Sequence, residues 1–373
     1  MPVNIDITSL EDTLRGNTEL LDESLDLDTG NYKMRIRSNS SVLLERLADY
    51  FAHIVSTTTP DIEILAIESR VLNSGLDFID WAREPGKTGR KDAYFDIPGV
   101  RVLLKVRTGM LFLQSEKSRI AAGPCLQNDN QVINFINTQY MNWLQRRGWL
   151  ICHAAALVYH GQDKQNRGFG IAGFSGGGKS TLMLHLLGHD GMFYLTNDRL
   201  FIRNTADGVL ARGIPKLPRV NPGTIVHDPN LHSLIPSEQR HSLLSMPAGK
   251  LWELEDKYDV SIEQLYGPGR IVNEAPLDAM LLLNWQRGSD KPLKVEQVDL
   301  NRRRDLLGTM MKSPGPFYQY ADGSFHQDTA GFDEQAYLDQ LDGVSIYEVS
   351  GGIDFPRLAE SWLELLDDTH HSV

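Results

Sequence analysis

The sequence predicts an α/β protein with two domains, a small α+β domain over residues 1–148 and an α/β domain over residues 149–373. Three observations support this prediction. The chain has 373 residues, which is more than one ordinary hydrophobic core holds. From residue 149 onward, strand-like apolar runs alternate with helical patterns. One strand-to-helix transition in this part carries a glycine-rich loop, residues 173–180.

The first domain opens with an acidic, weakly periodic stretch. Apolar residues at helical spacing then predict helices, and short β-rich runs bounded by turn residues predict strands. The last predicted helix begins with Asn and Asp and ends with Arg, a polarity that the helix dipole favours. The predicted elements are a helix at 41–55, strands at 62–67 and 93–97, a hairpin at 100–115 with Arg-Thr-Gly as its turn, and a helix at 128–147.

The second domain is predicted from the same two periodicities. A middle stretch, 211–275, is rich in Pro, Gly and His and is predicted to be a long irregular segment of the kind that forms lids or substrate loops. The predicted elements are a strand at 149–161, a buried strand at 169–174, a helix at 179–189, a strand pair at 192–203, a core strand at 277–285 and a final helix at 355–368.

Composition excludes several classes of protein. Apolar residues make up 41% and charged residues 23%, as in soluble globular proteins. The net charge of −12 argues against a general nucleic-acid or anionic-membrane binder, which needs a basic surface. The two cysteines lack zinc-site spacing, so a reducing compartment is expected. The polar, acidic N-terminus is not a signal peptide, and no apolar run reaches the roughly 20 residues of a membrane span. We therefore expect a cytoplasmic protein.

The glycine-rich loop, "GFSGGGKS", fits the pattern G-x-x-x-x-G-K-[ST] without a mismatch. Glycines let consecutive backbone N–H groups converge on an anion, and the following helix adds its own N–H groups and dipole. A glycine loop that merely turns the chain is the alternative. The pattern predicts a site for ATP with Mg²⁺, in which Lys179 binds the β- and γ-phosphates. The residues expected to bind the nucleotide are Gly173, Ser175, Gly176, Gly177, Gly178, Lys179, Ser180 and Thr181.

A carboxylate is expected to face this loop. Asp198 follows Lys179 by 19 residues and lies at the end of the next predicted strand. The carboxyl ends of adjacent parallel strands meet at one edge of a sheet, so Asp198 should stand beside the loop. There it would hold Mg²⁺ together with Ser180, or accept the proton of an attacking hydroxyl. A surface-turn Asp is the alternative, and Arg199 is expected to point to the opposite face of the strand.

Other P-loop classes lack their markers in this chain. The guanine-specific N-K-x-D pattern of GTPases is absent, and "VSGGID" at 349–354 is a poor match to the L-S-G-G-Q of transporter ATPases. A recombinase-type ATPase would place an acidic pair at the end of a late apolar strand. The predicted core strand at 277–285 ends in Asn284 and Trp285 instead.

These residues resemble a known family. "ICHAAALVYHG", "GFGIAGFSGGGKSTLMLHLL" and "GMFYLTNDRLFIR" are similar to the catalytic domain of the HPr kinase/phosphorylase family, and more closely to its HPr-kinase-related kinase B relatives. The specific similarity covers roughly residues 150–220. It implies a P-loop kinase domain of the HPr kinase / phosphoenolpyruvate carboxykinase type, transfer of the γ-phosphoryl group of ATP to a hydroxyl, and an oligomer above the monomer.

The resemblance also implies residue roles. His153 matches the family's strand-borne His near the phosphates, and Asp198 matches the second acid of an Asp-Asp pair. Asn197 stands where the first Asp is expected, and Leu210 where the family has an acid before Arg-Gly. An amide cannot act as a base, so the reverse, phosphorolytic reaction and HPr itself as the acceptor stay open. Its apolar neighbours alone favour a buried core residue over a catalytic one, and this alternative stays open beside the role that the resemblance implies.

A basic cluster in the middle stretch offers a further catalytic group. "RGIPKLPR" contains Arg212, Lys216 and Arg219, of which Arg219 or Lys216 is favoured to reach the transferred phosphoryl group and neutralise its charge. A solvated loop is the alternative. The sequence is consistent with two functions. The first is a kinase whose acceptor is a small molecule or a Ser or Thr of a protein or peptide. The second is a regulatory module that binds ATP and transfers nothing.

Overall fold

The computed structural model describes residues 6–83, 88–161, 164–174 and 176–368. The chain is a mixed α/β structure with several sheets, divided into two compact units. Unit 1 comprises Met1–Gly148 and Ser313–Gly331, and unit 2 comprises Trp149–Lys312 and Phe332–Val373. The segment 313–331 thus belongs with the N-terminal unit, whereas the sequence analysis assigned it to the C-terminal domain.

Unit 1 is built on an eight-stranded sheet with the order β1-β2-β3-β8-β7-β6-β5-β4. The pairs β2–β3 and β3–β8 are parallel and the others are antiparallel. The predicted hairpin is present as β6 and β7, and the two predicted helices as α2 and α3. The elements are α1 (Ile7–Arg15), β1 (Ser24–Asp28), β2 (Lys33–Ser38), α2 (Ser41–Tyr50), β3 (Ile62–Glu68), β4 (Ile79–Asp80), β5 (Asp92–Ile97), β6 (Val100–Lys105), β7 (Met110–Ser115), β8 (Arg119–Gly123) and α3 (Asp129–Gln145).

One buried arginine holds the returning segment 313–331 in unit 1. The Arg101 side chain is 0% exposed and forms an ion pair of 2.7 Å with Asp96. It also donates to the carbonyl oxygens of Pro316, at 2.8 Å, and His326, at 2.9 Å. A buried charge is tolerated when it is paired and hydrogen-bonded in this way. The guanidinium also lies over the rings of Trp81, Tyr94 and Phe325.

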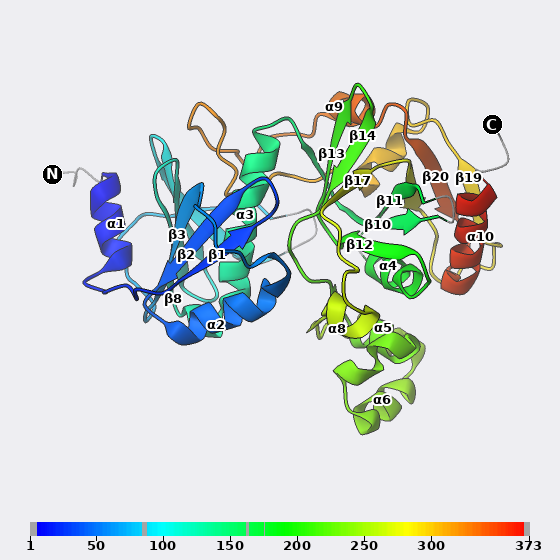
Figure 1. Ribbon diagram of the computed structural model, residues 1–373, viewed down its shortest axis with the longest axis horizontal. Helices are drawn as coiled ribbons and strands as arrows, with labels where there is room; N and C mark the ends of the chain where they lie inside the picture. The colour runs from blue at the N-terminus through cyan, green and yellow to red at the C-terminus, as the bar shows by residue number, and fades with distance from the viewer. Residues whose placement is uncertain (1–5, 84–87, 162–163, 175, 369–373) are drawn as a thin grey trace. The chain divides into compact units, whose positions relative to one another are not determined.

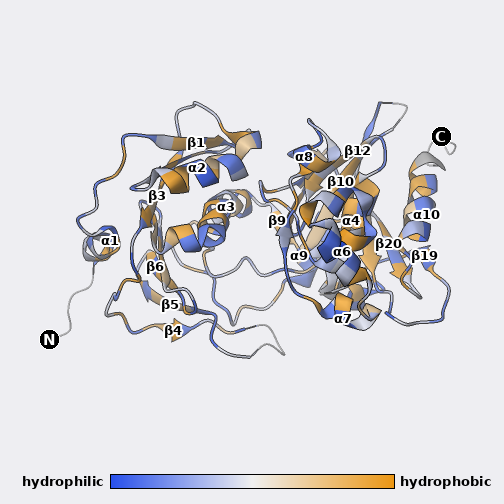
Figure 2. Ribbon diagram, turned by 90° about the horizontal axis from the view of Figure 1, so that it is seen from below, coloured by the Kyte–Doolittle hydropathy of each residue, from blue (hydrophilic) through white to orange (hydrophobic). Residues whose placement is uncertain are grey.

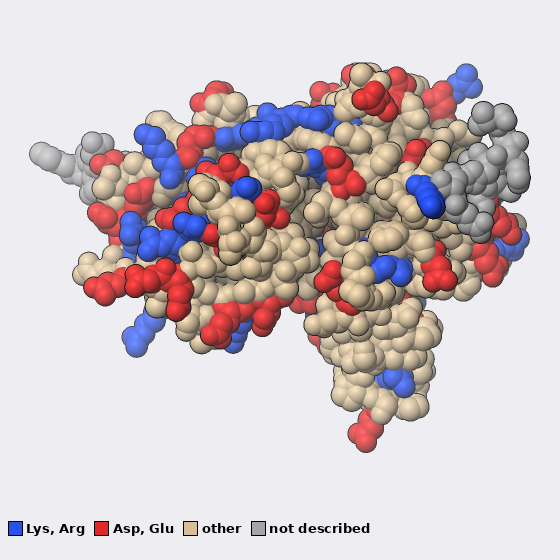
Figure 3. Space-filling view, in the orientation of Figure 1, with Lys and Arg blue, Asp and Glu red and all other residues tan. Residues whose placement is uncertain are grey.

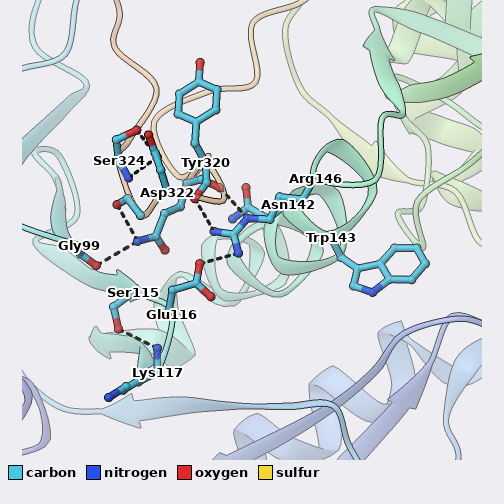
Figure 4. Close-up of polar contacts among 12 residues, drawn as sticks. Gly99, Ser115, Glu116, Lys117, Asn142, Trp143, Arg146, Tyr320, Asp322 and Ser324 are labelled. Atoms are coloured by element: carbon cyan, nitrogen blue, oxygen red, sulfur yellow. Dashed lines mark hydrogen bonds and ion pairs between the residues drawn. The ribbon is translucent and has the colours of Figure 1, made fainter.

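A second arginine binds the same segment from the end of α3 (Figure 4). Arg146 donates through Nε to the carbonyl oxygen of Gln319 at 2.7 Å and pairs with Glu116 at 2.5 Å. The Gln319 amide donates in turn to the carbonyl oxygen of Gly99 at 3.0 Å. These contacts join residues far apart in the sequence, which is why no local pattern marked the segment as part of the first unit.

Unit 2 contains a six-stranded sheet with the order β12-β10-β11-β18-β20-β19. Strands β11, β18 and β20 are parallel, while β10 is antiparallel to both of its neighbours. Figure 2 shows β10 and α4, which packs on it, coloured as hydrophobic over much of their length. The elements are β10 (Ala154–His160), β11 (Asn166–Gly173), α4 (Lys179–Leu187), β12 (Met192–Thr196), β18 (Ala279–Leu283), β19 (Lys294–Gln297), β20 (Ser345–Ser350) and α10 (Phe355–Asp368).

A four-stranded antiparallel sheet with the order β17-β14-β13-β9 completes the scaffold of unit 2. The predicted strand at 149–161 is therefore two strands, β9 and β10, which belong to different sheets and separate at His153. The predicted pair at 192–203 likewise divides between the sheets at residues 197–199. The elements are β9 (Leu150–Cys152), β13 (Leu200–Thr205), β14 (Gly208–Arg212) and β17 (Glu274–Pro276).

The middle stretch is less irregular than the sequence predicted. It contains a series of short helices, one of which begins at Pro222, where the fixed φ of proline favours a helix start. In Figure 1, α5 and α6 project from the rest of unit 2, and the projection shows few charged side chains on the face drawn in Figure 3. The elements are β15 (Arg219–Val220), α5 (Pro222–His227), α6 (Ser237–Leu244), α7 (Ala248–Glu253), β16 (Tyr258–Asp259) and α8 (Ile262–Tyr266).

Two further elements of unit 2 are η4 (Arg304–Thr309) and α9 (Glu334–Gln340). In the sequence they lie on either side of the segment 313–331, which belongs to unit 1. Within the residues that the structure describes, no helix combines the length and the apolar character needed to cross a membrane.

Candidate functional site

The glycine-rich loop connects the end of β11 to the start of α4. Gly176 and Gly178 adopt φ values of +78° and +86°, a left-handed region that residues with a Cβ rarely enter. The N–H of Gly177 donates to the carbonyl oxygen of Phe174 at 2.9 Å and closes the turn. Gly173 lies so close to β18 that an added Cβ would approach Cβ of Leu283 to 2.9 Å. Ser175, the remaining predicted ligand of the loop, lies outside the described residues.

Lys179 is the first residue of α4, and its side chain returns over the loop. Its Nζ donates to the carbonyl oxygen of Gly173 at 2.8 Å. Burial lowers the pKa of Lys179 to about 8, the negative charge of Asp198 opposes this shift, and the positive charge of Lys312 adds to it. Lys179 therefore lies within electrostatic reach of both residues.

Ser180 and Thr181 occupy the first turn of α4 and are partly buried. The Thr181 hydroxyl lies 2.8 Å from the hydroxyl of Thr224, which belongs to α5. The helix after the loop is thus tied to the first of the short helices in the middle stretch.

His153 and Asp198 meet at the two places where the chain passes from one sheet to the other. Nε2 of His153 lies 3.2 Å from Oδ1 of Asp198, and their side chains are 30% and 34% exposed. The backbone N–H of His153 donates to the carbonyl oxygen of Met310 at 2.7 Å, outside both ladders. Each residue can face its partner because neither lies within a strand.

Two further cations flank the Asp198 carboxylate. Nε of Arg199 lies 3.7 Å from Oδ2, and Nζ of Lys312 lies 4.0 Å from Oδ1. Burial acts to raise the pKa of Asp198, but the hydrogen bond from His153 and the charges of Lys312 and Arg199 outweigh it and hold the pKa well below its usual range. The carboxylate is therefore ionised at neutral pH.

The position of Arg199 corrects the expectation that it points away from Asp198. Residues 197–199 form a bend between β12 and β13, so the alternation of side chains along a strand does not apply to them. The strand arrangement that brings Asp198 to the loop's edge of the sheet also differs from the prediction. β12 is not adjacent to β11, because β10 lies between them. Both are antiparallel to β10, so β11 and β12 run in the same direction and end at the same edge of the sheet.

The basic cluster of the middle stretch divides between the site and its surroundings. Burial lowers the pKa of Lys216 to about 8, with a further decrease from Arg199 and an increase from Asp198, so Lys216 lies near the carboxylate. Arg219 pairs with Asp259 at 3.2 Å and donates to the carbonyl oxygen of Lys257. Its charge still contributes to the lowered pKa of Lys216.

Arg212 has a different role. It pairs with Glu274 on the neighbouring strand β17, and its guanidinium lies over the ring of Trp149 at 5.1 Å. This arginine therefore binds the four-stranded sheet together.

Sequence reasoning missed Lys312. The preceding residue, Met311, forms an isolated antiparallel bridge with Cys152. The backbone N–H of Lys312 itself donates to the Tyr337 hydroxyl at 3.0 Å. The same hydroxyl donates to the carbonyl oxygen of Ile151 at 2.7 Å. This long-range pairing brings Lys312 beside His153 and Asp198, and no local motif marks it.

The chemistry of the oxygen donors fits Mg²⁺. Ser180 offers a hydroxyl and Asp198 an ionised carboxylate, and Mg²⁺ in kinase sites takes one or two protein oxygens together with phosphate and water. Among the described residues, no group of three or more His, Cys, Asp and Glu side chains could hold a metal by itself.

No protein-family model and no curated protein matches the chain. One solved structure that resembles it is the Hpr(Ser) kinase/phosphatase from Coxiella burnetii. The two are 13% identical, the match covers 60% of this chain and 99% of that one, and the TM-score is 0.30. This similarity is weak and does not decide what the chain does.

Proposed function

We propose that the chain is an ATP-dependent kinase that transfers the γ-phosphoryl group to a hydroxyl of an acceptor. One observation carries the proposal: an ionised carboxylate, Asp198, is held by His153 within electrostatic reach of Lys179 in the glycine-rich loop. Phosphoryl transfer needs a phosphate-binding loop and a carboxylate beside it. The glycine-rich loop and Asp198 are the parts of unit 2 that we propose for these two roles.

The loop and α4 bind the phosphates in this proposal. Backbone N–H groups of the loop and of the first turn of α4 point at the phosphate oxygens, and the helix dipole favours their negative charge. Lys179 exchanges its contact with the carbonyl oxygen of Gly173 for the β- and γ-phosphates. The incoming charge raises the pKa of Lys179, so its ammonium group is fully charged in the complex.

The acceptor hydroxyl attacks the γ-phosphorus and forms a new O–P bond, while the bond from that phosphorus to the β-phosphate oxygen breaks and ADP leaves. Asp198 orients the hydroxyl and accepts its proton. The low pKa of Asp198 makes it a weak base at the start of the reaction. A loose transition state requires little deprotonation of the attacking oxygen until the new bond forms, when that oxygen becomes strongly acidic.

The surrounding cations neutralise the charge on the transferred group. Lys312 and Arg199 flank the carboxylate, and Lys216 lies close enough for its pKa to respond to the charge of Asp198. Cations fixed in advance stabilise the charge that develops on the equatorial phosphoryl oxygens. Ser180 and Asp198 would hold Mg²⁺, which supplies further neutralisation of the β- and γ-phosphate charge.

Unit 2 is in this account a P-loop kinase of the HPr kinase / phosphoenolpyruvate carboxykinase type, with a protein, peptide or small-molecule hydroxyl as acceptor. The test is incubation of the purified chain with γ-labelled ATP and a cell extract, followed by mass spectrometry of the labelled species. A labelled phosphoester supports the kinase. Bound ATP without a labelled product contradicts it.

A second function is favoured by one observation. Asn197 stands beside Asp198, and its side-chain oxygen is buried without a hydrogen-bond partner among the described residues. An amide cannot take a proton from a hydroxyl. A regulatory module that binds ATP and transfers nothing is therefore the alternative, and the same labelling experiment distinguishes the two.

A further inference from the structure

The strand β18 is followed by Asn284 and Trp285 rather than by an acidic pair. Trp285 is 8% exposed, and its indole N–H donates to the carbonyl oxygen of Gly177 at 2.9 Å. The contact joins a residue after β18 to the second half of the glycine-rich loop. A buried indole N–H needs an acceptor, and here the acceptor is the backbone of the loop itself.

A second aromatic ring encloses the next residue of the loop. A Cβ added to Gly178 would approach Cζ of Phe355 to 2.6 Å, so the ring lies directly against the glycine. The rings of Phe355 and Trp285 are 5.1 Å apart with an interplanar angle of 90°, an edge-to-face contact. The two rings support each other as well as the loop. We call this pair the aromatic bracket.

We propose that the aromatic bracket is a positioning device for nucleotide binding. The peptide between Gly177 and Gly178 is planar and trans, so its C=O and N–H point in opposite directions. Because Trp285 fixes the carbonyl oxygen, the N–H of Gly178 is directed away from the indole, toward the side of the peptide on which the phosphates bind. The ring of Phe355 prevents the peptide from turning over.

The bracket is anchored in the core of unit 2. Phe355 is the first residue of α10, and Trp285 lies two residues past the end of β18, a strand of the six-stranded sheet. Both rings of the bracket are therefore held by elements of the six-stranded sheet and its covering helix. An unliganded glycine loop is free to sample many conformations, and fixing one peptide in advance reduces the entropy lost when the phosphates bind.

The test uses a matched pair of substitutions in the full chain, W285F and W362F. Both replace a buried tryptophan of unit 2 by phenylalanine. W285F removes the hydrogen bond from the indole N–H to the loop. W362F removes no such bond, because the indole N–H of Trp362 has no partner among the described residues. Affinity for ADP and ATP is measured by calorimetry, and the thermal midpoint of each variant is measured without nucleotide.

We expect W285F to bind ADP and ATP about two- to tenfold more weakly than the wild type, the range for one neutral hydrogen bond. W362F should bind as the wild type does even where its thermal midpoint falls. The change in tryptophan fluorescence on ADP binding should be present in the wild type and reduced in W285F.

The inference rests on the nucleotide-binding half of the proposed function, and the outcomes separate the two. If the wild type binds no nucleotide, both are overturned. If the wild type binds ADP and W285F binds it equally well, or if W362F loses as much affinity as W285F, the bracket alone is overturned.

Discussion

His153 and Asp198 are 45 residues apart in the sequence, yet Nε2 of the one lies 3.2 Å from Oδ1 of the other. Both residues lie where the backbone passes between the two sheets of unit 2. This pairing has a consequence for stability. The folded state holds the pKa of Asp198 below its value of about 3.9 in an unfolded chain, so its contribution to stability is fully present above pH 4 and is lost as the pH falls.

We therefore predict that D198N has a weaker acid dependence of stability than the wild type. The thermal midpoint of the wild type should fall further between pH 7 and pH 3 than that of D198N. D207N, which changes an exposed turn carboxylate, serves as the control and should follow the wild type. Parallel curves for the wild type and D198N would show that Asp198 gains no stabilisation from its neighbours.

Nucleotide affinity should depend on pH through the buried lysines. The pKa values of Lys179 and Lys216 are lowered to about 8, so both lose their charge as the pH rises through this value in the free protein. ATP affinity should therefore be constant below about pH 7 and decrease above pH 8. The measurement is calorimetric titration from pH 6.5 to 9.5, and an affinity that does not change across this range contradicts the assignment.

Removal of the loop lysine should weaken nucleotide binding more strongly than removal of any other cation in the site. Charge-assisted hydrogen bonds contribute about 1.5–3 kcal/mol, which corresponds to roughly a ten- to hundredfold loss of ATP affinity in K179A. K250M, which changes an exposed lysine of α7, is the control. Unchanged binding by K179A would remove Lys179 from the phosphate site.

Lys312 should act on the transferred group and not on nucleotide capture. K312M removes a cation 4.0 Å from the carboxylate and should lower kcat about ten- to a thousandfold while ATP affinity changes little. K312R should recover part of the rate. A loss of ATP affinity as large as the loss of kcat would place Lys312 among the binding groups instead.

The returning segment of unit 1 provides a stability prediction. R101M leaves Asp96 without its partner and removes two bonds to the segment 313–331, so the free energy of unfolding should fall by about 3–5 kcal/mol. R90M breaks the exposed pair with Asp80, whose side chains are 57% and 52% exposed, and should cost less than about 1 kcal/mol. Denaturant unfolding measures both, and similar losses would contradict the structural role of Arg101.

Short sequence patterns predicted the glycine-rich loop and several helices and strands, because these depend on residues that are neighbours in the sequence. The spacing of glycines before Lys179 identified the loop because the turn needs those residue types wherever it occurs. The hairpin at 100–115 and the helix at 128–147 were predicted for the same reason. Asp198 follows a strand that ends at the same edge of the sheet as the loop, although through a strand arrangement that the sequence analysis did not predict.

Long-range pairing decided the rest. Lys312 reaches the carboxylate because Met311 bridges Cys152, and this contact leaves no mark in the residues around it. The segment 313–331 joins unit 1 through Arg101 and Arg146. Within the segment, these arginines bind backbone carbonyl oxygens, which every sequence has, so no side-chain pattern predicts the contact. The orientation of Arg199 was predicted wrongly because the sequence does not show that the chain leaves β12 before residue 197.

The most direct test of the central claim compares the wild type and D198N in one experiment, with ATP binding measured by calorimetry and phosphoryl transfer measured from γ-labelled ATP. We predict ATP affinity within about threefold of the wild type and transfer lowered at least about a hundredfold, the scale expected for a positioned acid–base group. Transfer by D198N at the wild-type rate would contradict the account, because the carboxylate of Asp198 would then have no part in the chemistry.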